Sequence, residues 1–221
     1  MVLVVIAQHQ LHSVGLYARR HIFGNKRASL IASAFPDFCY QPFLTSQDLA
    51  SLANYSEADD IYGPEVYNLI DDHQGNQHRS VFDLRTVSHT TGGGFTRASI
   101  SSEFLISLSE QTLTPFQLCI ESIANISLWG EDLDIDIEGE FIFSQNFNLT
   151  GPNREAIIKL FDKPLVNFFR TNTLLFTQGA LEVKESAIIF HHAFALAPQD
   201  IRATLVTLSK LIELLTRQTQ R

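Results

Sequence analysis

Cysteine is scarce in this sequence of 221 residues, which contains only Cys39 and Cys119. The pair lie far apart, fall in no Cys-x-x-Cys pattern and stand among apolar or aromatic neighbours. Disulfides persist in oxidising compartments, whereas isolated cysteines in apolar surroundings behave as small hydrophobic side chains. The spacing therefore predicts buried free thiols in a reducing compartment.

Long hydrophobic runs are also absent. The apolar stretch from Val2 to Ala7 ends after about six residues, whereas a helix that spans a bilayer needs roughly 20. No basic region precedes this stretch, which argues against a signal peptide. The sequence thus predicts a cytoplasmic protein, and the alternative is a protein attached peripherally to the inner face of a membrane through its N-terminal arm.

Positive charge is sparse as well. The formal net charge is -8, and the isoelectric point is about 5.4. The densest basic cluster is Arg19-Arg20-His21 with Lys26 and Arg27, and it is small. Nucleic acid and anionic lipid attract basic surfaces, so this balance disfavours nonspecific binding of either by the whole chain. We predict no nucleic-acid partner.

The chain does contain enough apolar residues for a core, with 45% hydrophobic and 18% charged residues. These fractions are typical of a globular protein. Phenylalanine is abundant at 17 residues, and it offers apolar area without a polar atom, so we expect it to fill the core. We predict a helical N-terminal arm over residues 1–44 and a single α+β domain over residues 45–221.

Strand patterns begin at Glu65 and continue to Phe194. Alternating apolar residues, bounded by polar and glycine-rich turns, predict strands separated by a polar turn at Asp71 to Asn76 and a hairpin turn at Gly92-Gly93-Gly94. Glycine adopts positive φ angles without strain, as a tight reversal requires. The predicted strands are Val66 to Ile70, His78 to Ser88, Phe95 to Ser109, Phe116 to Glu121, Leu181 to Val183 and Ala187 to Phe194.

Helical patterns dominate the C-terminal third. Asn153 is a good N-cap for one helix, and Pro164 should end that helix or begin the next. From about Pro198, apolar residues recur at the spacing of one buried helix face: Ile201, Leu205, Leu208, Ile212 and Leu215. The predicted fold class is α+β, a mainly antiparallel sheet with C-terminal helices packed on one face and a helical N-terminal arm.

Acidic residues alternate with apolar ones in the run EDLDIDIEGEF, which spans residues 131–141. We predict strands over Leu133 to Ile137 and over Phe141 to Leu149. A strand would place the carboxylates on one face and the apolar side chains on the other. Such an acidic face is most often solvated or protects a sheet edge, and this is the interpretation that we favour.

A cation site is the alternative for this acidic run. Asp132, Asp134 and Asp136 could bind Mg²⁺ or Ca²⁺, because hard cations take oxygen ligands and an Asp-apolar-Asp pattern occurs in nucleotide-transfer sites. The glycine-serine element expected upstream is missing, and an EF-hand loop would need glycine where Ile137 stands. Apart from this alternative, the sequence predicts no cofactor.

The histidines and glycines suggest no strong catalytic site. His191 and His192 are consecutive in a predicted strand, so they should point to opposite faces. His73, His78 and His89 could converge with Asp71 and Asp72, but a surface role is the favoured interpretation. The Gly92-Gly93-Gly94 loop precedes a strand pattern rather than a helix, unlike a phosphate-binding loop. No Gly-x-Ser-x-Gly elbow is present, and neither cysteine lies in a nucleophile-like setting.

Several short motifs resemble a group of uncharacterised bacterial domains that often follow one or two N-terminal transmembrane helices. They are Val81-Phe82-Asp83-Leu84-Arg85, Gly92-Gly93-Gly94, Leu113 to Leu118, Asn148-Leu149-Thr150-Gly151 and Ile158-Lys159-Leu160-Phe161. The resemblance covers about Asp48 to Leu215. It implies a fold and no known chemistry, and it supplies no site residues.

These observations favour a noncatalytic binding or scaffolding module over an enzyme. We predict a protein partner or a homo-oligomer, with a possible peripheral membrane contact through the N-terminal arm. The alternative is a metal-dependent enzyme that acts on a phosphorylated or nucleotide substrate through Asp132, Asp134 and Asp136.

Overall fold

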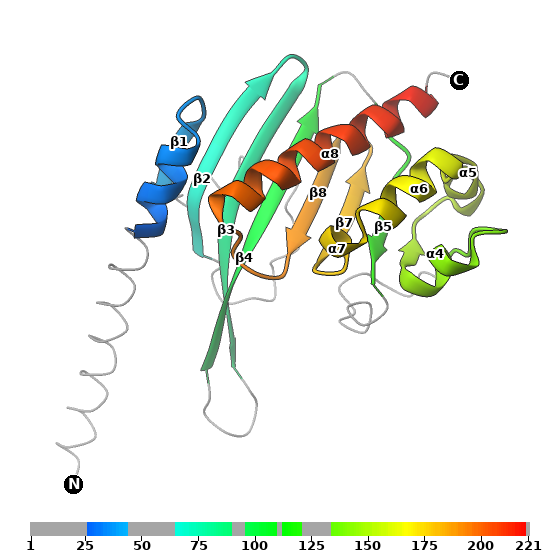
Figure 1. Ribbon diagram of the computed structural model, residues 1–221, viewed down its shortest axis with the longest axis horizontal. Coiled ribbons are helices and arrows are strands. Elements are labelled where there is room, and N and C mark those ends of the chain that lie inside the picture. Colours follow the sequence, from blue (N-terminus) through cyan, green and yellow to red (C-terminus); the bar gives the residue numbers. More distant parts are fainter. Residues whose placement is uncertain (1–25, 44–64, 90–95, 110–111, 121–133, 220–221) are drawn as a thin grey trace, which may run out of the picture.

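An antiparallel sheet forms the centre of the protein in the computed structural model, which describes residues 26–43, 65–89, 96–109, 112–120 and 134–219 (Figure 1). The sheet has eight strands in the order β1-β2-β3-β4-β8-β7-β5-β6, and every neighbouring pair is antiparallel. The strands are β1 (Cys39–Phe43), β2 (Glu65–Gln74), β3 (Gln77–His89), β4 (Thr96–Leu108), β5 (Phe116–Cys119), β6 (Asn148–Thr150), β7 (Gly179–Lys184) and β8 (Ala187–His192).

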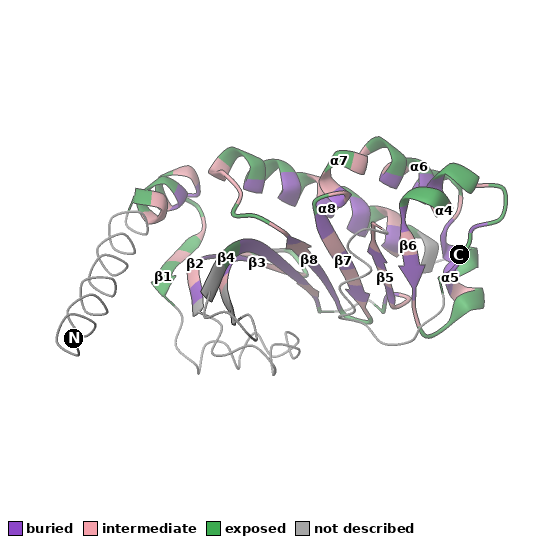
Figure 2. Ribbon diagram, turned by 90° about the horizontal axis from the view of Figure 1, so that it is seen from below, coloured by how far each residue is buried: buried purple, intermediate pink, exposed green. Residues whose placement is uncertain are grey.

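The described helices pack against one face of this sheet (Figure 2). They are residues 26–34, α4 (Phe141–Asn146), α5 (Arg154–Leu160), α6 (Lys163–Thr171), α7 (Thr173–Phe176) and α8 (Pro198–Thr219). The predicted class, an antiparallel α+β fold with C-terminal helices, is confirmed. No helix within the described ranges combines the length and apolar character needed to cross a membrane.

Two of the C-terminal helices begin at side-chain caps, of which the sequence predicts the one at Asn153. The Asn153 side chain accepts a hydrogen bond from the Ala156 amide at 3.0 Å, which caps α5. The Asp162 carboxylate accepts from the Leu165 amide at 3.2 Å, and Pro164 stands in the first turn of α6, where its missing N–H costs no helix bond. Pro164 therefore starts a new helix.

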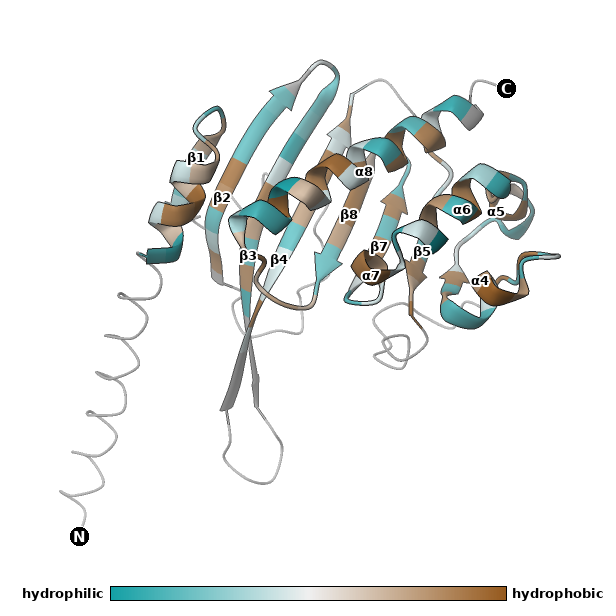
Figure 3. Ribbon diagram, in the orientation of Figure 1, coloured by the Kyte–Doolittle hydropathy of each residue, from teal (hydrophilic) through white to brown (hydrophobic). Residues whose placement is uncertain are grey.

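The core between the sheet and the helices is rich in phenylalanine, as predicted. Phe169 of α6 stacks on Phe161 at a centroid distance of 5.8 Å and meets Phe176 edge to face at 4.9 Å. Phe176 in turn contacts Phe190 of β8 at 5.6 Å. Hydrophobic and hydrophilic residues alternate along α8 (Figure 3), and its predicted stripe is buried: Ile201, Leu205, Leu208, Ile212 and Leu215.

The predicted strand over Phe141 to Leu149 is wrong. Residues 141–146 form α4, and only Asn148–Thr150 pair in the sheet as β6. Phe143 and Phe147 are four residues apart and both buried, with ring centroids 5.2 Å apart. That spacing is helical, and it outweighs the alternation that the sequence shows.

The predicted polar turn at Asp71 to Asn76 is also shorter than expected. The β2 strand continues to Gln74, which pairs with Gln77, so the turn contains only Gly75 and Asn76. Gly75 has a φ of 62°, the conformation that a type II′ hairpin requires at its first central residue.

The N-terminal segment is joined to the sheet by β1, which pairs antiparallel with β2 and forms one edge. Cys39 is exposed on this strand, so the prediction of a buried thiol is wrong for Cys39; Cys119 is half-buried, and both are free. Pro42 lacks an amide donor, which disfavours the addition of another strand at this edge. Residues 1–25 lie outside the described part of the chain, and the division at residue 44 and the membrane contact stay predictions.

Asp83 of β3 is a buried carboxylate on the helix-covered face that links several elements. It accepts hydrogen bonds from Arg27 Nε at 2.6 Å, Arg27 Nη2 at 2.7 Å, Asn68 Nδ2 at 2.8 Å and Ser102 Oγ at 3.1 Å. Asn68 lies at an irregularity in the pairing of β2 with β3 and has a φ of 55°, which asparagine tolerates better than most residues. This network ties residues 26–34 to the middle of the sheet.

Candidate functional site

The segment from Asp134 to Ile142, which we call the acidic turn, has a well-defined backbone. The Ile135 amide donates to the Leu149 carbonyl at 2.7 Å, and the Glu140 amide donates to the Ile137 carbonyl at 3.0 Å. Gly139 has a φ of 79°, as expected for the third residue of a type II turn. Ile135 and Ile137 are buried and anchor the segment in the core.

The outer side of the acidic turn combines negative charge with exposed apolar groups. Asp134, Asp136 and Glu138 are exposed. Phe141 and Ile142, at the start of α4, are 71% and 57% exposed, which is high for large hydrophobic side chains. Exposed acids alternate with the buried isoleucines, but residues 134–137 belong to no strand, so the predicted strand over Leu133 to Ile137 is wrong for the residues that the structure describes.

The predicted cation ligands are only partly described. Asp134 Oδ1 accepts a hydrogen bond from the Leu149 amide at 2.9 Å, so this oxygen already holds β6 in place. Asp136 is exposed, and Asp132 lies outside the described residues. The Mg²⁺ or Ca²⁺ site therefore stays a prediction.

Burial and, to a lesser extent, the negative charge of Asp134 raise the pKa of the Cys119 thiol.

A second polar group lies on the far face, by which we mean the face of the sheet opposite the described helices. Ser101 Oγ donates to Glu103 Oε1 at 2.7 Å, and His191 Nδ1 lies 2.5 Å from the same oxygen. Glu103 is fully buried, and its Oε2 has no hydrogen-bond partner among the residues that the structure describes. A serine nucleophile needs its hydroxyl directed at the imidazole base. Here the Ser101 hydroxyl donates to the Glu103 carboxylate instead. The carboxylate also pairs with His191, so the three side chains form a structural network around an ion pair.

Glu103 controls the charge of His191. Burial lowers the pKa of His191, but the hydrogen bond and the negative charge of Glu103 raise it more, so the pKa lies above its ordinary value. His192 points to the opposite face, as predicted, where it is buried and its Nδ1 lies 2.8 Å from the Phe194 carbonyl oxygen. The two consecutive histidines therefore belong to different environments.

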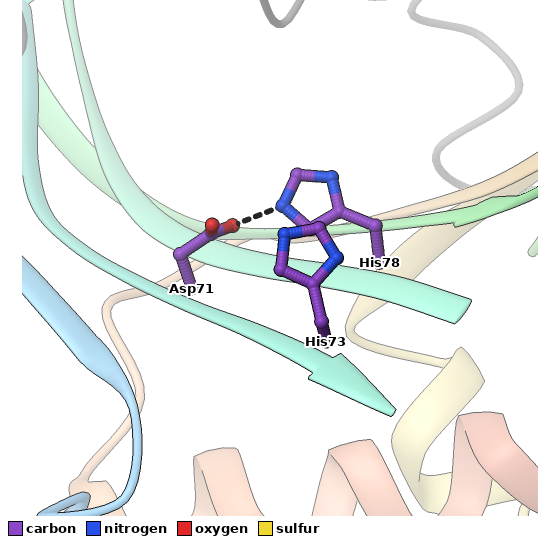
Figure 4. Close-up of side chains that lie close together, drawn as sticks. All are labelled: Asp71, His73 and His78. Atoms are coloured by element: carbon purple, nitrogen blue, oxygen red, sulfur yellow. Dashed lines mark hydrogen bonds and ion pairs between the residues drawn. The ribbon is translucent and has the colours of Figure 1, made fainter. Parts of the chain in front are cut away.

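The third polar group is at the β2–β3 hairpin (Figure 4). His73 pairs with His78 and Asp71 with Ser80 across the two strands, so the four side chains form a grid on the far face. The His73 and His78 rings stack at 4.2 Å with an angle of 6° between their planes. His78 Nε2 lies 2.6 Å from Asp71 Oδ1, and Ser80 Oγ donates to the same oxygen at 2.7 Å.

Part of the histidine cluster that the sequence left open as an alternative to a surface role is therefore present. Asp71, His73 and His78 converge, with ligand atoms within 4.8 Å of one another. Asp72 is instead paired with Arg79, and the side chain of His89 lies outside the described residues. Such alternation follows from the strand, because successive side chains point to opposite faces.

Sequence reasoning missed two features. The exposed pair Phe141 and Ile142 was assigned to a strand, and only the helical spacing of Phe143 and Phe147 could have revealed α4. Glu103 was not singled out, because an isolated glutamate in a strand looks like any solvated residue until its neighbours across the sheet are known.

The described fold defines an α+β protein built on one antiparallel sheet. No family model matches the chain, and none of the curated proteins matches it. The fold is similar to the crystal structure of the mycobacterial trehalose monomycolate transport factor A, with a TM-score of 0.58 and 12% sequence identity. The match covers 87% of this chain and 93% of that chain. At this identity, the likeness is one of fold alone.

Proposed function

We propose that this chain is a noncatalytic binding module that contacts a protein partner through the acidic turn. One observation carries the proposal: Phe141 and Ile142 are exposed in the same short segment as the exposed carboxylates of Asp134, Asp136 and Glu138. Protein interfaces commonly combine a few apolar or aromatic anchors with a polar rim. The acidic turn supplies both on a backbone held by hydrogen bonds, so little order has to be gained on binding.

The chemistry of the surface indicates the partner. Exposed carboxylates attract basic side chains, and an apolar anchor needs an apolar pocket, so the partner should be a basic protein segment with a hydrophobic groove. Transfer of one large apolar side chain out of water is worth about 1.5–3 kcal/mol. The net charge of -8 disfavours a second copy as the partner, although a homo-oligomer remains an outcome of the test.

One further observation supports a noncatalytic role. Ser101 Oγ donates to the Glu103 carboxylate, and His191 Nδ1 contacts the same carboxylate oxygen, so the serine is not arranged as an activated nucleophile.

The test uses the full chain immobilised and exposed to extracts of its native cells. We expect a partner that is retained at about 50 mM salt, weakened at about 500 mM salt, and lost with Phe141→Ser/Ile142→Ser. The matched control is Val206→Ser, because Val206 is also an exposed apolar residue but lies on α8. Equal capture by both variants would contradict the proposal, and sedimentation of the chain alone would reveal a homo-oligomer.

The alternative, a metal-dependent enzyme that uses Asp132, Asp134 and Asp136, makes a different prediction. Its bound ion would stabilise the folded state by mass action. Millimolar Mg²⁺ or Ca²⁺ should then raise the melting temperature of the natural chain and leave that of Asp134→Asn/Asp136→Asn unchanged. We expect the same small response from both chains, and a difference between them would favour the enzyme.

A further inference from the structure

We propose that Asp71, His73 and His78 form a binding site for a divalent first-row transition ion such as Zn²⁺. Two imidazoles and one carboxylate are a donor set that suits Zn²⁺ and its neighbours in the first row. A single carboxylate among nitrogen donors is a poor site for Mg²⁺ or Ca²⁺, which prefer oxygen ligands. This site is separate from the acidic turn and does not depend on the function proposed there.

The hairpin brings the ligands together. The pairing of Asp71 with Ser80 and of His73 with His78 places all four side chains on one face of adjacent strands. The short turn at Gly75 and Asn76 fixes this register, because the residue preceding it, Gln74, pairs with the residue following it. The ligands therefore come from a rigid part of the fold, as a metal site requires.

The distances are close to those of a bound site. Ligand atoms that lie 2.0–2.2 Å from a tetrahedral ion are separated from one another by about 3.4 Å. His78 Nε2 and Asp71 Oδ1 lie 2.6 Å apart and point at each other (Figure 4). An ion that replaces the proton between them therefore requires these two atoms to move apart only slightly. His73 must leave its stacked position and rotate toward the ion, which its exposure permits.

Ser80 has the position of a supporting residue. Its hydroxyl donates to Asp71 Oδ1 at 2.7 Å and so orients the carboxylate. Groups that orient metal ligands typically contribute roughly 10–100-fold to affinity. With three protein ligands, the ion would keep a coordination position for water or for a group from another molecule.

Calorimetric titration of the full chain with Zn²⁺ tests the site. We expect the natural chain to bind Zn²⁺, and we expect His73→Gln and Asp71→Asn each to bind it at least tenfold more weakly. Excess Mg²⁺ should not displace the bound Zn²⁺. His191→Gln is the matched control, because it removes a histidine from the same face without touching the hairpin. His9→Gln/His12→Gln is a second control, because these two histidines are three residues apart in the sequence and are not part of the hairpin.

His73 is exposed at the end of a hairpin, so its replacement should leave the fold intact, and circular dichroism of each variant checks this. Chemical shifts of the His73 and His78 imidazoles should move in step with added Zn²⁺. The proposal is overturned if the natural chain binds no Zn²⁺, if His73→Gln binds as tightly as the natural chain, or if the control variants lose as much affinity.

Discussion

Replacement of Arg27 by methionine tests whether the buried Asp83 carboxylate holds the N-terminal helical segment on the sheet. Asp83 is 3% exposed and accepts two of its hydrogen bonds from the Arg27 guanidinium. Arg27 Nη1 also donates to the Leu196 carbonyl at 2.7 Å. Methionine keeps the apolar stem of arginine but removes its charge, which leaves the carboxylate with the neutral donors of Asn68 and Ser102.

The cost follows from leaving a buried charge without its counterion. Removal of one partner from a buried ion pair typically costs about 3–5 kcal/mol. The low end applies here, because the Arg27 side chain is 24% exposed and Asp83 keeps neutral donors. We expect Arg27→Met to lower the free energy of unfolding by about 3 kcal/mol, which corresponds to a fall of roughly 6–12 °C in the melting temperature.

Urea unfolding of Arg27→Met, Asp83→Asn and the double variant measures this coupling. Once Asp83 is neutral, the loss of Arg27 should cost much less, so the double variant should be more stable than the sum of the single effects predicts. A loss below about 1 kcal/mol for Arg27→Met, with additive effects in the double variant, would show that the pair behaves like a surface ion pair. That result would refute the proposed role of Asp83.

Three other predictions concern ionisation, packing and thiol chemistry. Because Glu103 raises the pKa of His191, the pair should stabilise the fold fully below about pH 6.5 and less as the pH rises through the folded-state pKa. Urea unfolding of His191→Gln should therefore show its largest loss at low pH, and a loss that does not change with pH would contradict this. A Cβ on Gly179 would lie 2.5 Å from the His191 carbonyl oxygen, so Gly179→Ala should cost about 1–3 kcal/mol in thermal unfolding, and an unchanged melting temperature would be inconsistent with this packing. Burial raises the pKa of Cys119 whereas Cys39 is exposed, so a thiol reagent at neutral pH should react faster with Cys39, and Cys39→Ser should remove the fast phase; equal rates would disagree.

Much of the fold could be predicted from local patterns. The β7–β8 hairpin and the α8 stripe appear in the sequence because each has its own period of apolar residues and clear flanking turns. The caps at Asn153 and Asp162 act within a few residues, so a helix start after Asn153 was predictable. The class of the fold follows from these elements.

The errors occurred where tertiary packing decides between two periods. In the stretch from Phe141 to Leu149, the alternation suggests a strand, but Phe143 and Phe147 bury together as a helix does. Most residues of the predicted polar turn at Asp71 to Asn76 belong to β2 and pair with β3. The sequence does not show these partners, so it does not reveal that the strand continues.

The candidate sites depended even more on contacts between distant residues. Proximity of His73 and His78 was a possibility in the sequence, but which acidic neighbour faces them depends on the strand register, which selects Asp71 and turns Asp72 away. Glu103 and His191 are 88 residues apart and meet only because β4 pairs with β8. No local pattern could have joined them.

Site-specific photo-crosslinking tests the proposed binding role most directly. A photoreactive amino acid in place of Phe141 should crosslink to a basic protein partner in native cells, and the yield should fall when Asp134, Asp136 and Glu138 are replaced by their amides. The same group in place of Val206, which is 52% exposed on α8, should give no such product. A partner captured equally from both positions, or only from Val206, would contradict binding through the acidic turn.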